Sequence, residues 1–107
     1  MACVPPAIEN EVNYRDGYRC AYCGRSGFDV WTSMGIDHFK PKSRGGSDGT
    51  SNLHACCSAC NNYMQAKEFA TMEEARQHCR KCMTQDWIAY QVLIAKWLAD
   101  QMPRPAE

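Results

Sequence analysis

Two Cys-x-x-Cys pairs enclose the middle of this 107-residue chain. Cys20 and Cys23 form the first pair, Cys57 and Cys60 form the second, and 33 residues lie between the pairs. Two such turns present four thiolates, which can close one tetrahedral zinc shell. The separation exceeds the roughly 15–20 residues typical of a zinc ribbon, so we expect the segment between the pairs to be a functional insert.

The insert carries side chains that can transfer a proton and bind a hard cation. Asp37 and His38 are adjacent. A neutral histidine can accept a proton from water, and a carboxylate can hold Mg²⁺ beside a phosphate. On a strand the two side chains point to opposite faces, so they can serve one centre only at a bent strand end or a sheet edge. Taken alone, the dipeptide could equally be a capping Asp beside a surface His.

A basic, glycine-rich turn follows this pair. Lys40, Lys42 and Arg44 precede Gly45-Gly46, and glycine permits the close backbone approach that phosphate contacts need. The whole chain has a net charge of zero, but residues 14–44 alone have a net charge of +3. A locally basic face of this kind permits phosphate binding, while a mixed solvated surface is the alternative interpretation of the charge.

Other polar and sulfur-containing residues have simpler interpretations. Asn52 and Asn61 could orient a base and ligate a metal. We call the turns Cys20–Cys23 and Cys57–Cys60 the first and second knuckle. Cys56 does not have the two-residue spacing to Cys60 that Cys57 has, so it is expected in the core as a small hydrophobe. His54 could bind metal, although an alternating strand favours a polar face for it. Cys79-x-x-Cys82 lies in a helical pattern, where burial is favoured over ligation.

The pattern along the chain predicts a small α+β domain around these motifs. Strands are predicted at residues 36–40 and 51–55, joined by the Gly- and Ser-rich turn 41–50. A helix is predicted from residue 57 to about residue 69, beginning at the second Cys pair. Pro5-Pro6 opposes regular structure, which predicts a flexible arm at the N-terminus.

A second helix start is predicted by the capping box of Thr71 and Glu74. Apolar residues then recur at three- and four-residue spacing until Pro103. One uninterrupted helix over residues 72–101 would span about 45 Å, more than a domain of this size can cover. We therefore expect either a break near Thr84-Gln85 or a partner on the exposed part.

These elements divide the chain into a flexible N-terminal arm (1–12), a zinc-bound core (13–69), a C-terminal helical extension (70–102) and a tail (103–107). The first residues carry no charged segment followed by an apolar run, so no secretory signal is expected. No stretch approaches the roughly 18 apolar residues of a membrane span. Eight cysteines in such a chain indicate metal thiolates in the reducing cytoplasm rather than disulfides.

The segment from Arg19 to Tyr63 resembles the zinc-containing branch of the HNH endonucleases. The residues that carry the resemblance read RCAYCGRSG and IDHFKPKSRGGSDGTSNLHACCSACNNY, and the similarity extends over roughly residues 13–67. It implies a ββα-metal core, in which two strands and a helix surround one catalytic divalent ion. It also implies that a structural Zn²⁺ staples this core through Cys20, Cys23, Cys57 and Cys60.

The resemblance assigns further roles residue by residue. It implies that His38 is the general base and that Asn52 spans the hairpin to hold this base. Asp37 and Asn61 would ligate a catalytic Mg²⁺ or Mn²⁺. The family commonly has a lysine where this chain has Met64. The side chains expected to contact DNA are Lys40, Lys42, Arg44 and Lys67, the last lying nearly one helical turn beyond Met64.

The function that the resemblance implies is metal-dependent hydrolysis of phosphodiester bonds. The enzyme would nick double-stranded DNA and leave 5′-phosphate and 3′-hydroxyl ends. The alternative is a catalytically weak zinc module that binds DNA or protein, which Met64 and the overall neutrality favour. A purely structural zinc protein is a third interpretation. The C-terminal helix lies outside the resemblance and could pack on the core, form a homodimer or bind another protein; no membrane partner is expected.

Overall fold

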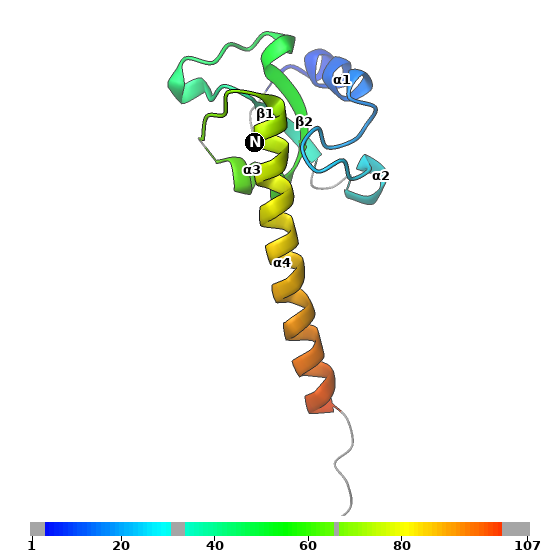
Figure 1. The fold of residues 1–107 in the computed structure, drawn as a ribbon. Coiled ribbons are helices and arrows are strands. Elements are labelled where there is room, and N and C mark those ends of the chain that lie inside the picture. The colour runs from blue at the N-terminus through cyan, green and yellow to red at the C-terminus, as the bar shows by residue number, and fades with distance from the viewer. Residues whose placement is uncertain (1–3, 31–33, 66, 102–107) are drawn as a thin grey trace, which may run out of the picture.

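The computed structural model describes residues 4–30, 34–65 and 67–101 as a small α+β fold (Figure 1). Its main elements are α1 (Pro6–Arg15), α2 (Gly27–Val30), β1 (Met34–His38), β2 (Leu53–Cys57), α3 (Ser58–Met64) and α4 (Met72–Gln101). Strands β1 and β2 form a two-stranded antiparallel sheet, and α3 follows β2 directly. This ββα order confirms the predicted fold class.

Both strands lie two residues further from the connecting loop than the sequence predicted, at 34–38 and 53–57. The side chain of Asn52 explains the difference. Its Oδ1 accepts the Lys40 N–H at 2.8 Å, and its Nδ2 donates to the Lys40 carbonyl at 3.1 Å. A side chain thus replaces a strand partner at Lys40, and Pro41 has no N–H to offer. The ladder therefore ends where His38 pairs with Leu53.

The N-terminal segment contains a helix where a flexible arm was predicted. Pro6 occupies the start of α1, where the missing proline N–H removes no helical hydrogen bond. Val12 of α1 is fully buried against Ile36 and Leu53. Arg15 at the end of α1 donates to the Leu53 carbonyl. The prediction was wrong because it took the proline pair as a breaker and missed the contact that the helix makes with the sheet.

A second core cluster surrounds the two Cys pairs. Cys56 and Cys79 are both fully buried in it, as predicted, and α3 packs against the first turns of α4 around it. Cys82 is only partly buried. The buried members of the cluster are Cys20, Tyr22, Cys56, Cys57, Cys60, Met64, Ala75 and Cys79.

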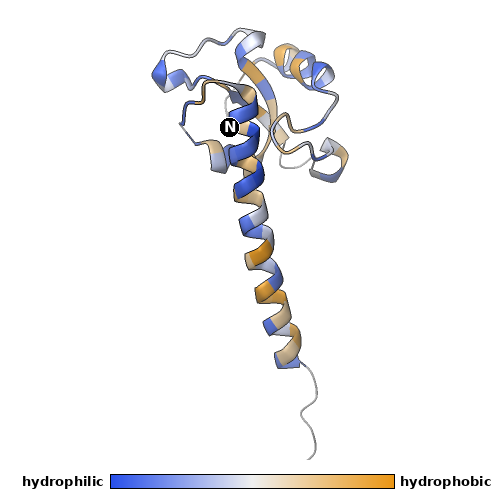
Figure 2. Ribbon diagram, viewed as in Figure 1, coloured by the Kyte–Doolittle hydropathy of each residue, from blue (hydrophilic) through white to orange (hydrophobic). Residues whose placement is uncertain are grey.

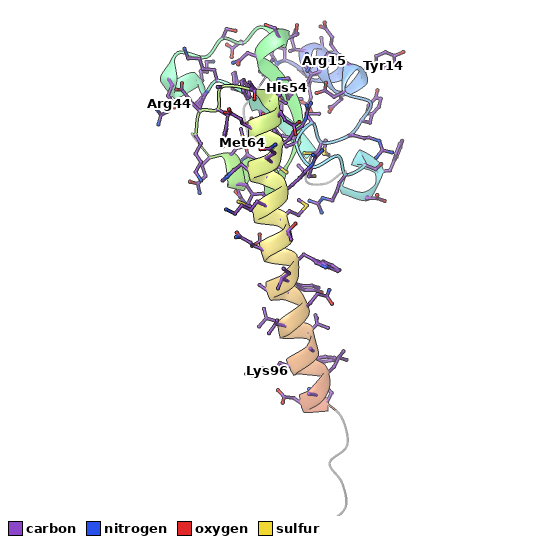
Figure 3. The ribbon with its side chains drawn as sticks, in the orientation of Figure 1. Tyr14, Arg15, Arg44, His54, Met64 and Lys96 are labelled. Carbon is purple, nitrogen blue, oxygen red and sulfur yellow. The ribbon has the colours of Figure 1, made fainter. Side chains whose placement is uncertain are left out.

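Helix α3 ends at Met64, earlier than the predicted end near residue 69. Gln65 has a φ of +47°, which lies outside the helical region and turns the chain. Met64 is 1% exposed and belongs to the core cluster; Figure 3 labels it. Lys67 is exposed and lies beyond α3, so it is not placed one helical turn from Met64 as expected.

Helix α4 begins at the predicted cap and then runs unbroken. Thr71 Oγ1 accepts the Glu74 N–H at 3.2 Å, and the Glu74 carboxylate accepts the Ala70 N–H at 3.2 Å. The break expected at Thr84-Gln85 does not occur, since residues 72–101 contain neither glycine nor proline.

Beyond its first turns, α4 leaves the core as a rod and gives the molecule extents of 67 × 26 × 20 Å (Figure 1). Within the described residues, no helix has the combination of length and apolar character that crossing a membrane requires.

Candidate metal centre and active site

The two Cys pairs meet in one compact group of sulfur atoms. The Sγ atoms of Cys20, Cys23, Cys57 and Cys60 all lie within 4.8 Å of one another, and those of Cys23 and Cys57 are 3.8 Å apart. Four sulfurs placed about 2.3 Å from a tetrahedral Zn²⁺ are separated by about 3.8 Å. The predicted four-cysteine cluster is therefore formed, and its geometry suits a metal such as zinc.

Each pair presents its sulfurs through the same backbone device. The Cys23 N–H donates to Cys20 Sγ, and the Cys60 N–H donates to Cys57 Sγ, each at 3.5 Å. Cys57 is also the N-cap of α3, so one turn both starts the helix and presents two ligands. N–H groups directed at sulfur favour the thiolate form that zinc requires.

A cation lies beside the sulfur cluster. Arg25 Nη2 donates to Cys57 Sγ at 3.4 Å, which raises the pKa of the guanidinium. Hydrogen bonds from Cys20, Cys23 and Cys60 lower the pKa of the Cys57 thiol. Arg25 had no assigned role in the sequence analysis beyond its contribution to the basic charge. The signal available in the sequence was its position two residues after Cys23, next to Gly24.

Cys79 and Cys82 do not extend the metal cluster. In the described part of the chain, the four knuckle cysteines are the one group of three or more His, Cys, Asp or Glu side chains with metal-binding spacing. Cys82 Sγ instead lies 3.7 Å from His78 Nε2, and that ring nitrogen is 2.8 Å from the Tyr63 carbonyl oxygen.

Asp37 is a buried carboxylate near the end of β1. It is 8% exposed, and its Oδ2 accepts a hydrogen bond from the Tyr22 hydroxyl at 2.7 Å. Burial raises the pKa of Asp37, with the Tyr22 bond and the neighbouring His38 acting against this. Tyr22 lies between Cys20 and Cys23, so the first knuckle positions the carboxylate. The sequence analysis missed Tyr22, whose signal was an aromatic residue with a polar tip inside a ligand turn.

His38, the last residue of β1, contacts the following loop. Its Nε2 lies 2.8 Å from Asp48 Oδ1, and the His38 side chain is 7% exposed. In the neutral imidazole, Nε2–H donates to this carboxylate and Nδ1 is the proton acceptor. The hydrogen bonds from His38 and Lys42 lower the pKa of Asp48. The sequence analysis missed Asp48, because no spacing rule connects a turn aspartate with a strand histidine.

The side chain of Asn52 holds the loop between β1 and β2, which carries Asp48. Besides its two bonds to Lys40, its Nδ2 donates to the Ser47 carbonyl at 2.9 Å. Gly46 permits this closure, since a Cβ at Gly46 would lie 1.8 Å from the Lys40 carbonyl oxygen. The side chain of Asn52 thus ties together both sides of the loop between β1 and β2.

The remaining predicted site residues lie around this loop and on α3. Asn61 lies directly after Cys60 on α3, a helix that packs against β1, where Asp37 lies. Lys40, Lys42 and Arg44 are exposed on the loop (Figure 3 labels Arg44). The oxygen atoms of Asp37 and Asn61 suit Mg²⁺ or Mn²⁺, since Mg²⁺ commonly takes one or two carboxylates and completes its shell with water and phosphate. The donor chemistry therefore fits the expected ion.

His54 lies opposite Asp37 in the sheet register. Its ring packs edge-on near the rings of Tyr22 and Phe39, with centroids 6.3 and 6.2 Å away. It shares this face with the polar Asp37 and is partly buried rather than fully exposed, because Tyr22 of the first Cys pair lies against it. Burial lowers the pKa of His54, with the charge of Asp16 acting against this.

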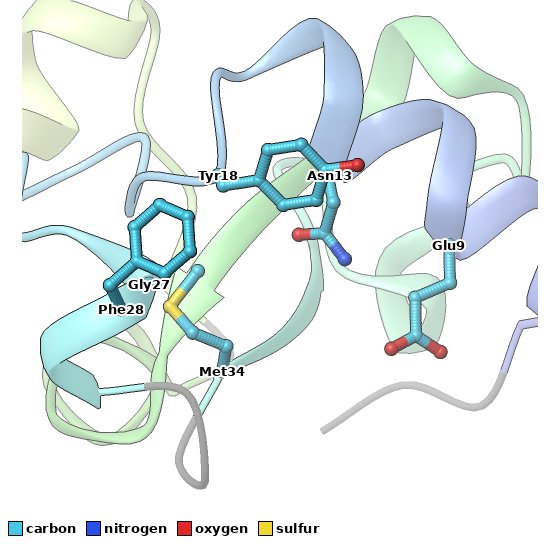
Figure 4. A pocket seen from close by; sticks show the side chains of 6 residues that line it. All are labelled: Glu9, Asn13, Tyr18, Gly27, Phe28 and Met34. Carbon is cyan, nitrogen blue, oxygen red and sulfur yellow. The ribbon is translucent and has the colours of Figure 1, made fainter.

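A separate cavity of about 240 Å³ opens between α1, α2 and the start of β1. Figure 4 shows the rings of Tyr18 and Phe28 beside Met34, with Glu9 and Asn13 on the α1 side. Met34 and His38 are at opposite ends of β1, about 14 Å apart at 3.4 Å per residue. This cavity is therefore distinct from the candidate site.

Residues 20–67 match the family model described as HNH endonuclease. The matched segment contains both Cys pairs, the sheet, its connecting loop and α3. The match confirms the resemblance and supports a function of nuclease type. A comparison with curated proteins finds no match.

Proposed function

We propose, on the premise that residues 20–67 are an HNH endonuclease segment, that this protein is a metal-dependent nuclease that nicks double-stranded DNA. The observation that carries the proposal is the contact between His38 and Asp48 beside the buried carboxylate of Asp37. A proton acceptor and a hard cation ligand are thus consecutive residues at the end of β1, where the ladder stops. The loop that follows them carries exposed Lys and Arg side chains.

His38 acts as the general base in this proposal. Asp48 accepts the Nε2–H, which fixes the ring and leaves Nδ1 to take a proton from water. The deprotonated water attacks phosphorus in line with the 3′ oxygen, so the products carry 5′-phosphate and 3′-hydroxyl ends. Asn52 holds the loop that carries Asp48 and so keeps the base in position.

A Mg²⁺ or Mn²⁺ ion held by Asp37 and Asn61 supplies charge stabilisation at the phosphate and the leaving oxygen when it is bound. Tyr22 fixes one oxygen of Asp37, which limits rotation of the carboxylate. Lys40, Lys42, Arg44 and Lys67 contact backbone phosphates, which orients the duplex without reading its sequence. A structural Zn²⁺ on the four knuckle cysteines holds β2, α3 and Tyr22 together.

A supercoiled-plasmid assay with and without Mg²⁺ or Mn²⁺ tests the proposal. His38→Ala should lower the nicking rate by about 10²–10⁴, the range typical of losing a general base. Its zinc content and its DNA affinity should match those of the parent. His38 does not contact the sulfur cluster, and its one link to an exposed lysine runs through Asp48 to Lys42. A zinc-loaded His38→Ala protein that nicks as fast as the parent at saturating metal would sink the proposal.

The second candidate is a zinc module that binds DNA or protein with little catalysis. One observation favours it: Met64, at the position where the family commonly has a lysine, is buried in the core and brings no charge to the site. The same assay separates the two candidates. A parent protein that binds DNA but leaves the plasmid supercoiled with either ion would support the module.

A further inference from the structure

The projecting half of α4 carries an apolar stripe on one face. From Met83 to Trp97 its residues follow one another at three- and four-residue spacing, and Leu98 is next to Trp97. Its four most exposed members are Trp87 at 60%, Tyr90 at 56%, Trp97 at 58% and Leu98 at 52%, while three other exposed apolar residues of α4, Ile88, Val92 and Leu93, lie outside these positions. Figure 2 shows the hydrophobic positions along this part of α4. A contiguous exposed patch rich in aromatic residues marks an interaction surface. We call it the apolar stripe, and it consists of Met83, Trp87, Tyr90, Ile94, Trp97 and Leu98.

The stripe continues the helix face that packs on the core. Ala75 and Cys79 are fully buried, and Met83 packs against the same core cluster. Trp87 follows Met83 by four residues, which keeps it near the same face. One face of α4 is therefore buried against α3 at its start and exposed further along, where another helix could cover it in the same way.

We propose that α4 of a second copy of this chain covers the stripe, packed antiparallel to the first. The spacing from Met83 to Trp97 alternates four and three residues, the heptad pattern that pairs two helices along a seam. An antiparallel two-fold arrangement places Trp87 against the partner's Trp97 and Tyr90 against the partner's Ile94. The stripe is thus complementary to itself, which a symmetric dimer interface requires.

The position of the core decides between the two helix directions. A parallel partner helix would have to continue alongside residues 72–83, where α3 already packs against α4. An antiparallel partner helix would end near Met83, before it reaches α3. The antiparallel arrangement therefore avoids a clash that the parallel arrangement would create.

A groove lies where the antiparallel partner helix would end. It has a volume of about 600 Å³ and is lined by Cys23, Arg25, Arg80, Met83, Thr84 and Trp87. The C-terminal end of a helix carries partial negative charge. The partner's Asp100 adds a carboxylate at that end, so the two arginines of the groove complement the partner's helix terminus. The repulsion between Asp86 and the partner's Asp100 is weak, because solvent and salt screen it.

The charge of the stripe region favours a second copy over nucleic acid or an anionic membrane. Residues 84–101 contain Asp86, Lys96 and Asp100 as their charged side chains, a net charge of −1 (Figure 3 labels Lys96). Nucleic acid and anionic lipid both require a basic surface. The whole chain has a net charge of zero, so two copies meet without overall repulsion.

The area available is enough for a specific dimer. A buried aromatic side chain contributes about 150–250 Å², so each half-exposed aromatic of the stripe offers roughly 100 Å². With the aliphatic members and the groove, the two copies would bury roughly 1,000 Å² in total, near the lower bound for specific interfaces.

Sedimentation of the full-length, zinc-loaded chain tests the dimer. The parent should have twice the 12.1 kDa mass of one chain at micromolar concentration. Trp87→Glu should halve this mass while the zinc content stays the same. The matched control is Val92→Glu, because Val92 is 65% exposed but lies away from the stripe, and this variant should remain a dimer. A monomeric parent would leave the stripe to another protein and overturn the proposal, as would a larger assembly.

Mixing two monomeric variants tests the orientation. Trp87→Glu and Trp97→Lys should each be monomeric alone. In an antiparallel pair the two introduced charges face each other and the other two tryptophans still meet, so an equimolar mixture should regain the dimer mass. In a parallel pair each charge would face a tryptophan, and the mixture would stay monomeric. Failure of the mixture to recover dimer would overturn the antiparallel arrangement.

Discussion

At the scale of single residues, both Asp37 and His38 have a neighbour that fixes the orientation of the side chain. Tyr22 donates to Asp37, and Asp48 lies within hydrogen-bonding distance of His38. Buried polar groups need such partners, since an unsatisfied group loses its hydration without compensation. Here the partners also restrict rotation, which a base and a metal ligand both require.

The role of Asp48 leads to a prediction about rate rather than affinity. Asp48→Ala removes the acceptor of the His38 Nε2–H, so the ring loses its fixed orientation while the base itself remains. We expect kcat for plasmid nicking to fall by roughly ten- to a hundredfold, with little change in KM for DNA. Initial nicking rates at varied DNA concentration, with DNA in excess over enzyme, measure both. An unchanged kcat would leave Asp48 as a surface partner of Lys42 alone.

His54 leads to a prediction about stability and pH. Burial lowers the pKa of His54 below its ordinary value of 6.5, so the folded protein holds the neutral ring. As the pH falls below about 6.5, the unfolded chain takes up the proton first, and the folded state becomes less stable. His54→Gln should therefore lose less stability than the parent between about pH 7 and pH 6.

Urea unfolding at saturating Zn²⁺ at these two pH values makes the comparison. Zinc release by acid affects both proteins alike, so the difference between them isolates residue 54. Equal losses in the parent and in His54→Gln would show that the ring is as easily protonated in the folded state as in the unfolded state.

At the scale of elements, the second knuckle joins β2 to α3 through one turn. Cys57 ends the strand, caps the helix and contributes a sulfur to the cluster. Elements this short have little stability of their own, because a helix shorter than about 12 residues is marginal in water. A metal on the four cysteines would therefore hold the ββα unit together.

Removing one of these ligands should uncouple the unit. Cys60→Ser should lower the zinc content below one per chain and leave the protein poorly folded, since zinc binding and folding are linked. Cys82→Ser is the matched control, because Cys82 lies outside the four-cysteine group. Metal analysis and circular dichroism measure the outcome. A well-folded, zinc-free Cys60→Ser protein would refute the assignment.

The loop between the strands is the predicted element of DNA contact. Changing Lys40, Lys42 and Arg44 together to Ala should weaken binding about equally for all DNA sequences. The slope of log affinity against log salt should flatten by roughly one unit for each phosphate that the loop no longer neutralises. The control changes Lys81 and Lys96, exposed lysines of α4, to Ala. A flatter slope in this control but not in the loop variant would move the DNA face to α4.

The elements that the sequence predicted correctly are those set by local chemistry. The ligand turns and the Thr71–Glu74 cap depend on residues a few positions apart. The errors arose where a distant group replaces a local partner. Asn52 takes the Lys40 backbone out of the ladder, so that both strands lie further from the loop than predicted, and α1 is stabilised by a sheet that follows it in the chain.

The candidate site was predictable to the same extent. Asp37 and His38 were identified because they are adjacent in a motif. Tyr22 and Asp48, which hold them, are brought close only by the folded knuckle and loop, and no sequence period connects either residue to its partner. The partners of a site are therefore harder to find than its reacting groups, since orientation is a tertiary property.

At the scale of the whole molecule, the two halves of α4 have different surroundings. The start of α4 completes the cysteine-rich core cluster through Ala75 and Cys79, and its end leaves that cluster entirely. Where the rod leaves the core, the Tyr63 hydroxyl of α3 donates a hydrogen bond to Asp86 of α4. Beyond Asp86, every residue of α4 that the structure describes is exposed or only partly buried. The core and the stripe can therefore be separated without cutting through buried side chains.

A chain that ends at Asp86 should consequently keep the core and remove only the stripe beyond it. We expect one zinc per chain and a free energy of unfolding within about 1 kcal/mol of the parent monomer, because the removed residues bury little against the core. Urea unfolding of the zinc-loaded shortened chain makes the test. The reference is full-length Trp87→Glu, because neither protein then has a functional stripe. A shortened chain that fails to fold or to retain zinc would show that the rod supports the core through contacts beyond Asp86, and the division of α4 into two parts would be wrong.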